Sequence, residues 1–138
     1  MSTLDALQTT LAAEHAAVYV YGVLGGQTSR TSDPALFAAV TAAYGEHRAR
    51  RDALTRDVTD LGGTPVAAEA SYDLPAALGT APAVARVALA LEVSCASTYA
   101  FLVASTVGPR RRWAAVALRD AAVRELGFGG APAPLPGT

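Results

Sequence analysis

The sequence predicts an all-α domain: an antiparallel four-helix bundle made of two helical hairpins joined by a long crossover. Four segments repeat apolar residues at alternating steps of three and four, which is the period of one helix face. Glycine and proline separate these segments. One separating stretch, residues 62–80, is long enough to carry the chain from one end of a bundle to the other.

The first helix is expected over residues 3–24, with the glycine pair that follows as its stop. Its core stripe contains an acid and consists of Leu4, Leu7, Leu11, Glu14, Val18 and Tyr21. Residues 16–24 are apolar on every side of this helix, so the face near Tyr19 and Val23 needs another partner. We therefore predict a homodimer through the first helical hairpin.

The second helix is expected to begin at Asp33–Pro34, because aspartate suits an N-cap and proline suits the first helical position. Gly62–Gly63 would end it. Its predicted core stripe is Phe37, Val40, Tyr44, His47, Arg51, Leu54, Val58 and Leu61. The opposite face alternates basic and acidic residues four apart, which is typical of a solvated surface.

The third helix is expected over residues 82–107 and is apolar nearly all round, which predicts burial on most sides. Between Val87 and Pro109 the single charged residue is Glu92, and this length could cross a bilayer. A glutamate in mid-span is costly in lipid, so we favour the central helix of a soluble bundle, with no membrane partner.

Gly108–Pro109 interrupts the chain, and the fourth helix is expected over residues 110–126. Its predicted core stripe is Trp113, Val116, Asp120 and Val123. The bundle thus occupies residues 3–127, and the proline-rich residues 128–138 are predicted to be an extended or disordered tail.

Composition narrows the function classes. The formal net charge of -1 argues against a nucleic-acid binder that neutralises phosphates. The one cysteine, Cys95, excludes an intramolecular disulfide and any zinc site with two or more thiolates. The first residues lack the basic region and apolar block of a signal peptide, so a cytoplasmic location is expected.

A dimetal bundle takes a single glutamate from one helix of each hairpin and a Glu-x-x-His pair from the other. Glu14 and Glu92 fit the two single-glutamate positions. His47 and Asp120 lie on the core stripes of the other two helices, but neither belongs to a Glu-x-x-His pair. The candidate metal ligands are therefore these four residues, with Glu46 in reserve, and the metal would be iron or another divalent ion. Because neither pair is complete, no cofactor is expected.

The same acids have a second interpretation. Buried carboxylates are costly unless they are paired. Arg51, with Arg50 beside it, stands one turn after His47 on the core stripe and could take the place of a metal beside Glu14 or Glu92. The sequence is compatible with this salt-bridged state, with one bound metal and with a dimetal centre.

Tyr21 and Tyr99 lie seven residues after Glu14 and Glu92, on the same helix faces. Their hydroxyl groups could donate hydrogen bonds to the buried acids or serve redox chemistry, and packing with a bonded hydroxyl is the favoured interpretation. Cys95 is expected to be a small buried apolar residue.

Two stretches carry a resemblance to a known family: Leu11-Ala-Ala-Glu-His-Ala-Ala-Val-Tyr-Val-Tyr-Gly22 and Glu46-His-Arg-Ala-Arg-Arg-Asp52. Over nearly its whole length the chain resembles a ferritin-like domain family of unknown function from high-GC bacteria. The resemblance implies the ferritin-like fold and implies no established activity.

Three functions follow from these residues. The first is a ferritin-like bundle with a degenerate dimetal site and a structural or interaction role. The alternative is a metal-binding ferritin-like oxidase that uses the inward-facing carboxylates and one histidine. The third is a binder of a small apolar ligand, held where alanines leave the core thin.

Overall fold

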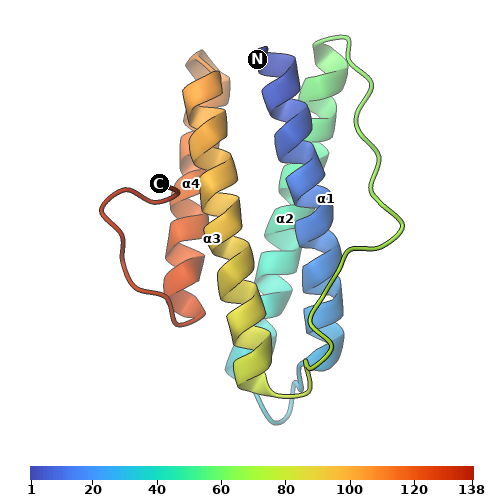
Figure 1. Ribbon diagram of the computed structural model, residues 1–138, viewed down its shortest axis with the longest axis vertical. Coiled ribbons are helices and arrows are strands. Elements are labelled where there is room, and N and C mark those ends of the chain that lie inside the picture. Colours follow the sequence, from blue (N-terminus) through green and yellow to red (C-terminus); the bar gives the residue numbers. More distant parts are fainter.

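The computed structural model describes residues 1–138 and contains four α-helices and no strands. The helices are α1 (Thr3–Gln27), α2 (Pro34–Asp60), α3 (Ala81–Ser105) and α4 (Gly108–Gly127). In Figure 1, α1 descends from the N-terminus and α2 rises beside it; the chain then crosses back along α1, rises again as α3 and descends as α4. The predicted all-α class with four helices is confirmed.

The C-terminal end of α1 and the N-terminal cap of α2 differ in detail from the prediction. α1 continues through Gly25 and Gly26, because glycine weakens a helix by about 1 kcal/mol without ending it. It stops where the backbone of Thr28 becomes extended, and the Thr28 hydroxyl donates a 2.7 Å hydrogen bond to the carbonyl of Leu24. Asp33 occupies the N-cap position of α2 as predicted, but its side chain makes no capping hydrogen bond.

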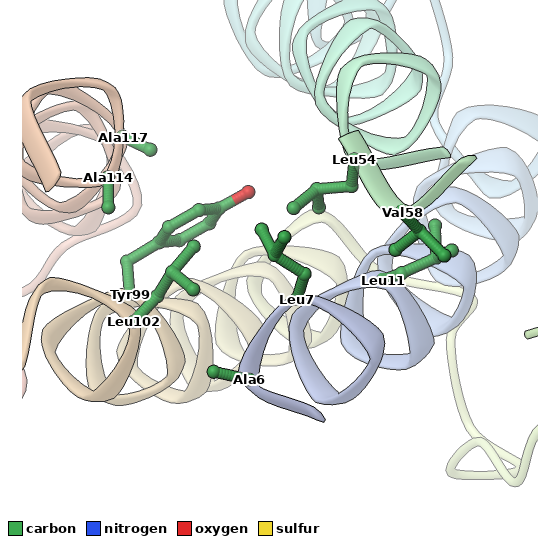
Figure 2. Close-up of a cluster of buried hydrophobic side chains, with 9 residues drawn as sticks. All are labelled: Ala6, Leu7, Leu11, Leu54, Val58, Tyr99, Leu102, Ala114 and Ala117. Carbon is green, nitrogen blue, oxygen red and sulfur yellow. The ribbon is translucent and has the colours of Figure 1, made fainter. Parts of the chain in front are cut away.

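The core consists of two large apolar clusters and a small third one, which comprises Ala17, Cys95, Ala96 and Ala121. One large cluster lies near the N-terminal end of α1 and receives side chains from all four helices (Figure 2). Its members are Ala6, Leu7, Leu11, Leu54, Val58, Tyr99, Leu102, Ala114 and Ala117. The other large cluster comprises Val20, Tyr21, Leu24, Val40, Ala43, Leu78, Val84, Ala88 and Phe128. Along α1, Glu14 lies between the two large clusters, so a charged residue is held in the middle of the bundle.

The buried face of α4 differs in part from the predicted one. Its fully buried residues are three alanines: Ala114, Ala117 and Ala121. Trp113 and Leu118 are half-buried and pack against the core, whereas the side chains of Val116 and Val123 are 47% and 60% exposed. Alanines allow α4 to pack closely on α3, and this contact outweighs the burial of the two valines. On α2 the buried arginine is Arg50, whereas Arg51 is half-buried.

α3 buries one stripe and not most of its surface. The stripe consists of Ala83, Val84, Ala88, Glu92, Cys95, Ala96, Tyr99 and Leu102. Val93, on the opposite side, is exposed. By length and composition alone α3 could cross a membrane, but in this structure it packs against α1 and α4 and buries a glutamate at its centre.

The crossover lies along α1 (Figure 1) and contacts the side chains of Gln8, His15 and Tyr19. The side-chain amide of Gln8 donates to the carbonyl of Thr64 at 2.6 Å and accepts from the backbone N–H of Val66 at 2.9 Å. Further along, the rings of Tyr19 and Tyr72 lie 5.4 Å apart. The outer face of α1 that was expected to need a partner is therefore covered in part by this chain itself.

The C-terminal residues fold back onto the bundle (Figure 1). Phe128 is buried in the core cluster with Tyr21, and the two rings lie 6.3 Å apart. Gly137 has a φ of +82° and lies against the backbone of Ala96, where a side chain would find no room. The tail has no helix, but it closes one side of α3.

Candidate functional site

Three of the predicted site residues meet at the centre of the bundle. His47, on α2, lies between Glu14 on α1 and Glu92 on α3. Its Nδ1 atom is 2.6 Å from Glu14 Oε2, and its Nε2 atom is 2.9 Å from Glu92 Oε1. All three residues are buried, with at most 1% of their surface exposed. One imidazole ring thus joins the two glutamates that the dimetal pattern singled out.

Two tyrosines and one arginine complete this network. The hydroxyl of Tyr99 donates to Glu14 Oε1 at 2.5 Å, and the hydroxyl of Tyr21 donates to Glu92 Oε1 at 2.6 Å. Arg124, on α4, donates from Nε to the same oxygen of Glu92 at 2.9 Å. The prediction that the tyrosines hydrogen-bond to the buried acids is confirmed. We call Glu14, Tyr21, His47, Glu92, Tyr99 and Arg124 the central network.

The charges of the central network compensate one another. Burial by itself lowers the pKa of His47, but the hydrogen bonds to Glu14 and Glu92 outweigh burial and raise the pKa above its ordinary value. Burial likewise acts to raise the pKa of Glu92, but the hydrogen bond and charge of His47, helped by Arg124, lower it. With His47 protonated, one imidazolium and one guanidinium balance two carboxylates.

The neighbouring weak acids stay protonated. Burial, reinforced by the nearby carboxylates, raises the pKa of both tyrosines, so their hydroxyl groups remain hydrogen-bond donors. Burial also raises the pKa of Cys95, which keeps the sulfur as a thiol. A buried thiol of this kind is a small apolar residue and not a nucleophile. This is the role that the sequence predicted for it.

Asp120 and Glu46 lie outside the central network. Asp120 is about one-third exposed and accepts a 3.1 Å hydrogen bond from Arg50 Nη2. Glu46 is exposed and makes no ion pair. Asp120 was expected to face inward, but it does not reach the central network, because the buried face of α4 is the alanine face and position 120 lies beside it.

The arginine that neutralises a buried acid is also not the expected one. Arg50 pairs with Asp120, and Arg51 pairs with its neighbour Asp52. Arg124 takes this role, and sequence reasoning missed it because the large apolar residues of α4 suggested a different buried face. Position 124 continues the alanine spacing of 114, 117 and 121, but the valine spacing of the same helix is equally regular, so the sequence did not decide between them.

The donor set does not fit a dimetal centre. Such a centre takes carboxylates from all four helices, whereas α2 and α4 here supply an imidazole and a guanidinium. Both nitrogens of His47 and both oxygens of Glu14 already have hydrogen-bond partners. Arg124 places a positive charge where a second cation would have to be held.

One smaller donor group remains. His47, Glu92 and Cys95 can each offer one ligand atom, and these atoms lie within 4.8 Å of one another. Glu92 Oε2 is buried and has no hydrogen-bond partner. A single ion there would need the thiol to lose its proton and the imidazole to give up its bond to Glu92.

Comparisons with known proteins give a family and a structural relative. A family model described as a domain of unknown function, DUF4439, matches residues 6–138. No curated protein matches the sequence significantly. The structure is similar to the crystal structure of a conserved hypothetical protein, rv2844, from Mycobacterium tuberculosis. The two are 30% identical with a TM-score of 0.82, over 91% of this chain and 87% of that one.

Proposed function

Because the chain belongs to the DUF4439 family of domains of unknown function, we propose its role from its own residues: a ferritin-like bundle whose dimetal site is degenerate, with a structural or interaction role. The course of the chain supports the ferritin-like assignment. Two helical hairpins are joined by a crossover that runs the length of α1, and each hairpin contributes a glutamate from the middle of one helix.

The position of His47 carries the proposal. Its ring lies 2.6 Å from one glutamate and 2.9 Å from the other, where a metal would be expected to join them. Two carboxylates brought into a low-dielectric core without a cation would repel each other strongly. An imidazolium between them, with Arg124 beside Glu92, supplies the charge that metal ions supply in a dimetal centre. The residues that remain hold the bundle together and do not oxidise a substrate.

The test is metal content after aerobic loading with ferrous iron and desalting, together with thermal unfolding in chelator. We expect far less than one iron per chain, because both nitrogens of His47 and both oxygens of Glu14 already have hydrogen-bond partners. We also expect chelator to leave the unfolding temperature unchanged. Retention of two irons per chain, lost in Glu14→Ala and kept in Glu69→Ala, would overturn the proposal. Glu69→Ala is the matched control because it removes an exposed acid of the crossover that is not a candidate ligand.

The alternative is a metal-binding protein, and one observation favours it: the unpartnered Oε2 atom of Glu92 beside His47 and Cys95. A thiol, an imidazole and a carboxylate suit zinc or cobalt better than iron in an oxidase. Titration with Co²⁺ would give a thiolate-to-cobalt absorption band that disappears in Cys95→Ala. The absence of this band in the unmodified chain would remove the alternative.

The homodimer through the first helical hairpin is kept as a proposal. Its motive was the apolar face of α1 near Tyr19 and Val23; Tyr19 now contacts Tyr72 of the crossover, and both Tyr19 and Val23 remain half-buried. Sedimentation velocity at micromolar concentration measures the assembly directly. A single monomeric species would contradict the proposed dimer.

A further inference from the structure

The seam between α2 and α4 is the loosely packed side of the bundle. α1 packs against α2 and α3, and α3 packs against α4, but α2 and α4 make hardly any close backbone contact. A cavity of about 200 Å³ lies in the seam, and we call it the seam cavity. Its apolar wall is formed by Ala49, Trp113, Val116 and Ala117. The central network does not line it.

One polar residue of the seam cavity lacks a hydrogen-bond partner for one of its atoms. Arg50 is 6% exposed and lines the cavity. Its Nη2 atom donates to Asp120 Oδ2, which also belongs to the lining, whereas Nη1 is buried and has no partner. A buried guanidinium nitrogen without an acceptor is unfavourable, and its best acceptor is a carboxylate. The guanidinium carbon of Arg50 also lies over the Tyr99 ring, 5.4 Å from its centre. Arg50 therefore adds to the cavity lining a charged group that still lacks one acceptor.

A second charged residue restricts the ligand further. Glu46 lines the same cavity one helical turn before Arg50, is exposed, and makes no ion pair. Because Arg50 and Asp120 neutralise each other, Glu46 leaves the lining with one net negative charge. A simple anion would be repelled by this charge. A molecule that carries an ammonium group close to its carboxylate would satisfy both residues.

We propose that the seam cavity binds a free α-amino acid. The carboxylate accepts from Arg50 Nη1, the ammonium group pairs with Glu46, and the side chain lies along Trp113 and Val116. The volume of about 200 Å³ suits this size, since it falls below the roughly 300 Å³ at which pockets for drug-sized ligands begin. This site lies outside the central network and does not depend on the proposed function of that network.

The first experiment is a thermal-shift screen of the full chain with each of the twenty common amino acids. Trp113 is the single tryptophan of the sequence, so its fluorescence reports binding of the non-aromatic ones at the cavity wall. At least one amino acid is expected to raise the unfolding temperature and shift the Trp113 emission. If none of the twenty does either at millimolar concentration, the proposal is wrong.

Two analogues of the best amino acid test the paired charges. One lacks the carboxylate and is the corresponding amine; the other lacks the amino group and is the corresponding carboxylic acid. Each is expected to bind at least about tenfold more weakly, because it leaves Arg50 or Glu46 without its partner. An amine that binds as tightly as the amino acid would rule out the role of Arg50, and an equally tight acid would rule out that of Glu46.

Substitutions locate the site. Glu46→Gln changes an exposed residue, so folding is expected to persist. It should weaken the amino acid at least fivefold and strengthen the carboxylic acid analogue. Arg50→Gln should abolish the preference for a carboxylate, with circular dichroism to verify the fold. Glu69→Gln, which alters an exposed glutamate of the crossover, is the matched control and should bind like the unmodified chain. Unchanged binding in Glu46→Gln and Arg50→Gln would refute the assignment.

Discussion

The free energy of unfolding should fall as the pH rises from about 6.5 toward 8, because folding holds a proton on His47. The pKa of His47 is raised above its ordinary value of 6.5 by hydrogen bonds to two carboxylates, although burial alone would lower it. Below pH 6.5 both the folded and the unfolded chain carry this proton, so the full stabilisation is present. Above it the unfolded chain loses the proton first, and stability declines until the pH passes the folded pKa.

The magnitude follows from one proton. Each pH unit between the unfolded and the folded pKa changes the free energy of unfolding by at most about 1.4 kcal/mol. Glu92 affects the free energy of unfolding at acidic pH. Its pKa is lowered from 4.5, so its contribution is present above pH 4.5 and is lost as the pH falls through the folded value. Stability should therefore be greatest between about pH 4.5 and 6.5.

The assay is urea unfolding, followed by circular dichroism and by Trp113 fluorescence, at several pH values from about 5 to 8. His47→Gln should remove most of the decline above pH 6.5, because the glutamine does not titrate. His15→Gln is the matched control: His15 is half-buried and bonds to the carbonyl of Val66 at 2.9 Å, so this variant should retain the decline. A stability that is flat or rises from pH 6.5 to 8 would refute the bridging imidazolium.

Three substitutions test the core by the same urea assay. Tyr99→Phe leaves a buried carboxylate oxygen without its donor and should cost about 1–3 kcal/mol; no loss would mean that water replaces the hydroxyl. Arg124→Met removes a hydrogen bond to the charged, buried Glu92 and should lower the free energy of unfolding by about 1.5–3 kcal/mol. An unchanged free energy of unfolding would contradict this pair. Leu54→Ala opens a cavity in the cluster of Figure 2 and should cost about 2–5 kcal/mol. Val116→Ala changes an exposed position of α4 and should alter the free energy of unfolding by no more than about 0.5 kcal/mol. A loss as large as that of Leu54→Ala would mean that Val116 is buried.

Helix periodicity was sufficient to find the acids and the histidine of the central network. Glu14, His47 and Glu92 interrupt apolar stripes on three different helices, and the stripes on these three helices are buried. The same pattern misplaced Asp120 on α4, because its apolar neighbours Val116 and Val123 are exposed. The tyrosines seven residues beyond the glutamates followed from the same spacing. These positions depend on the local period alone, which the sequence contains.

The choice of arginine could not be predicted in this way. After His47, both a step of three to Arg50 and a step of four to Arg51 agree with a helix period, and the stripe continues through Leu54 in either case. On α4 the alanine face and the valine face are both regular. Packing on α3 selects the alanines and brings Arg124 inward. That selection depends on the shape of a neighbouring helix, which no single segment of sequence records.

The unequal helix contacts have a mechanical consequence. The backbones of the two hairpins come close mainly along α1 and α3. α2 and α4 stand further apart and are joined by side-chain ion pairs, Arg50 with Asp120 and Arg110 with Asp57. Small rotations of one hairpin against the other would therefore pivot about α1 and α3 and widen the opposite edge. His47 and Arg124 come from the two helices at that edge, so the interior charges would meet water before the hairpins separate. The two cationic groups at the centre would then form part of the least protected region of the interior.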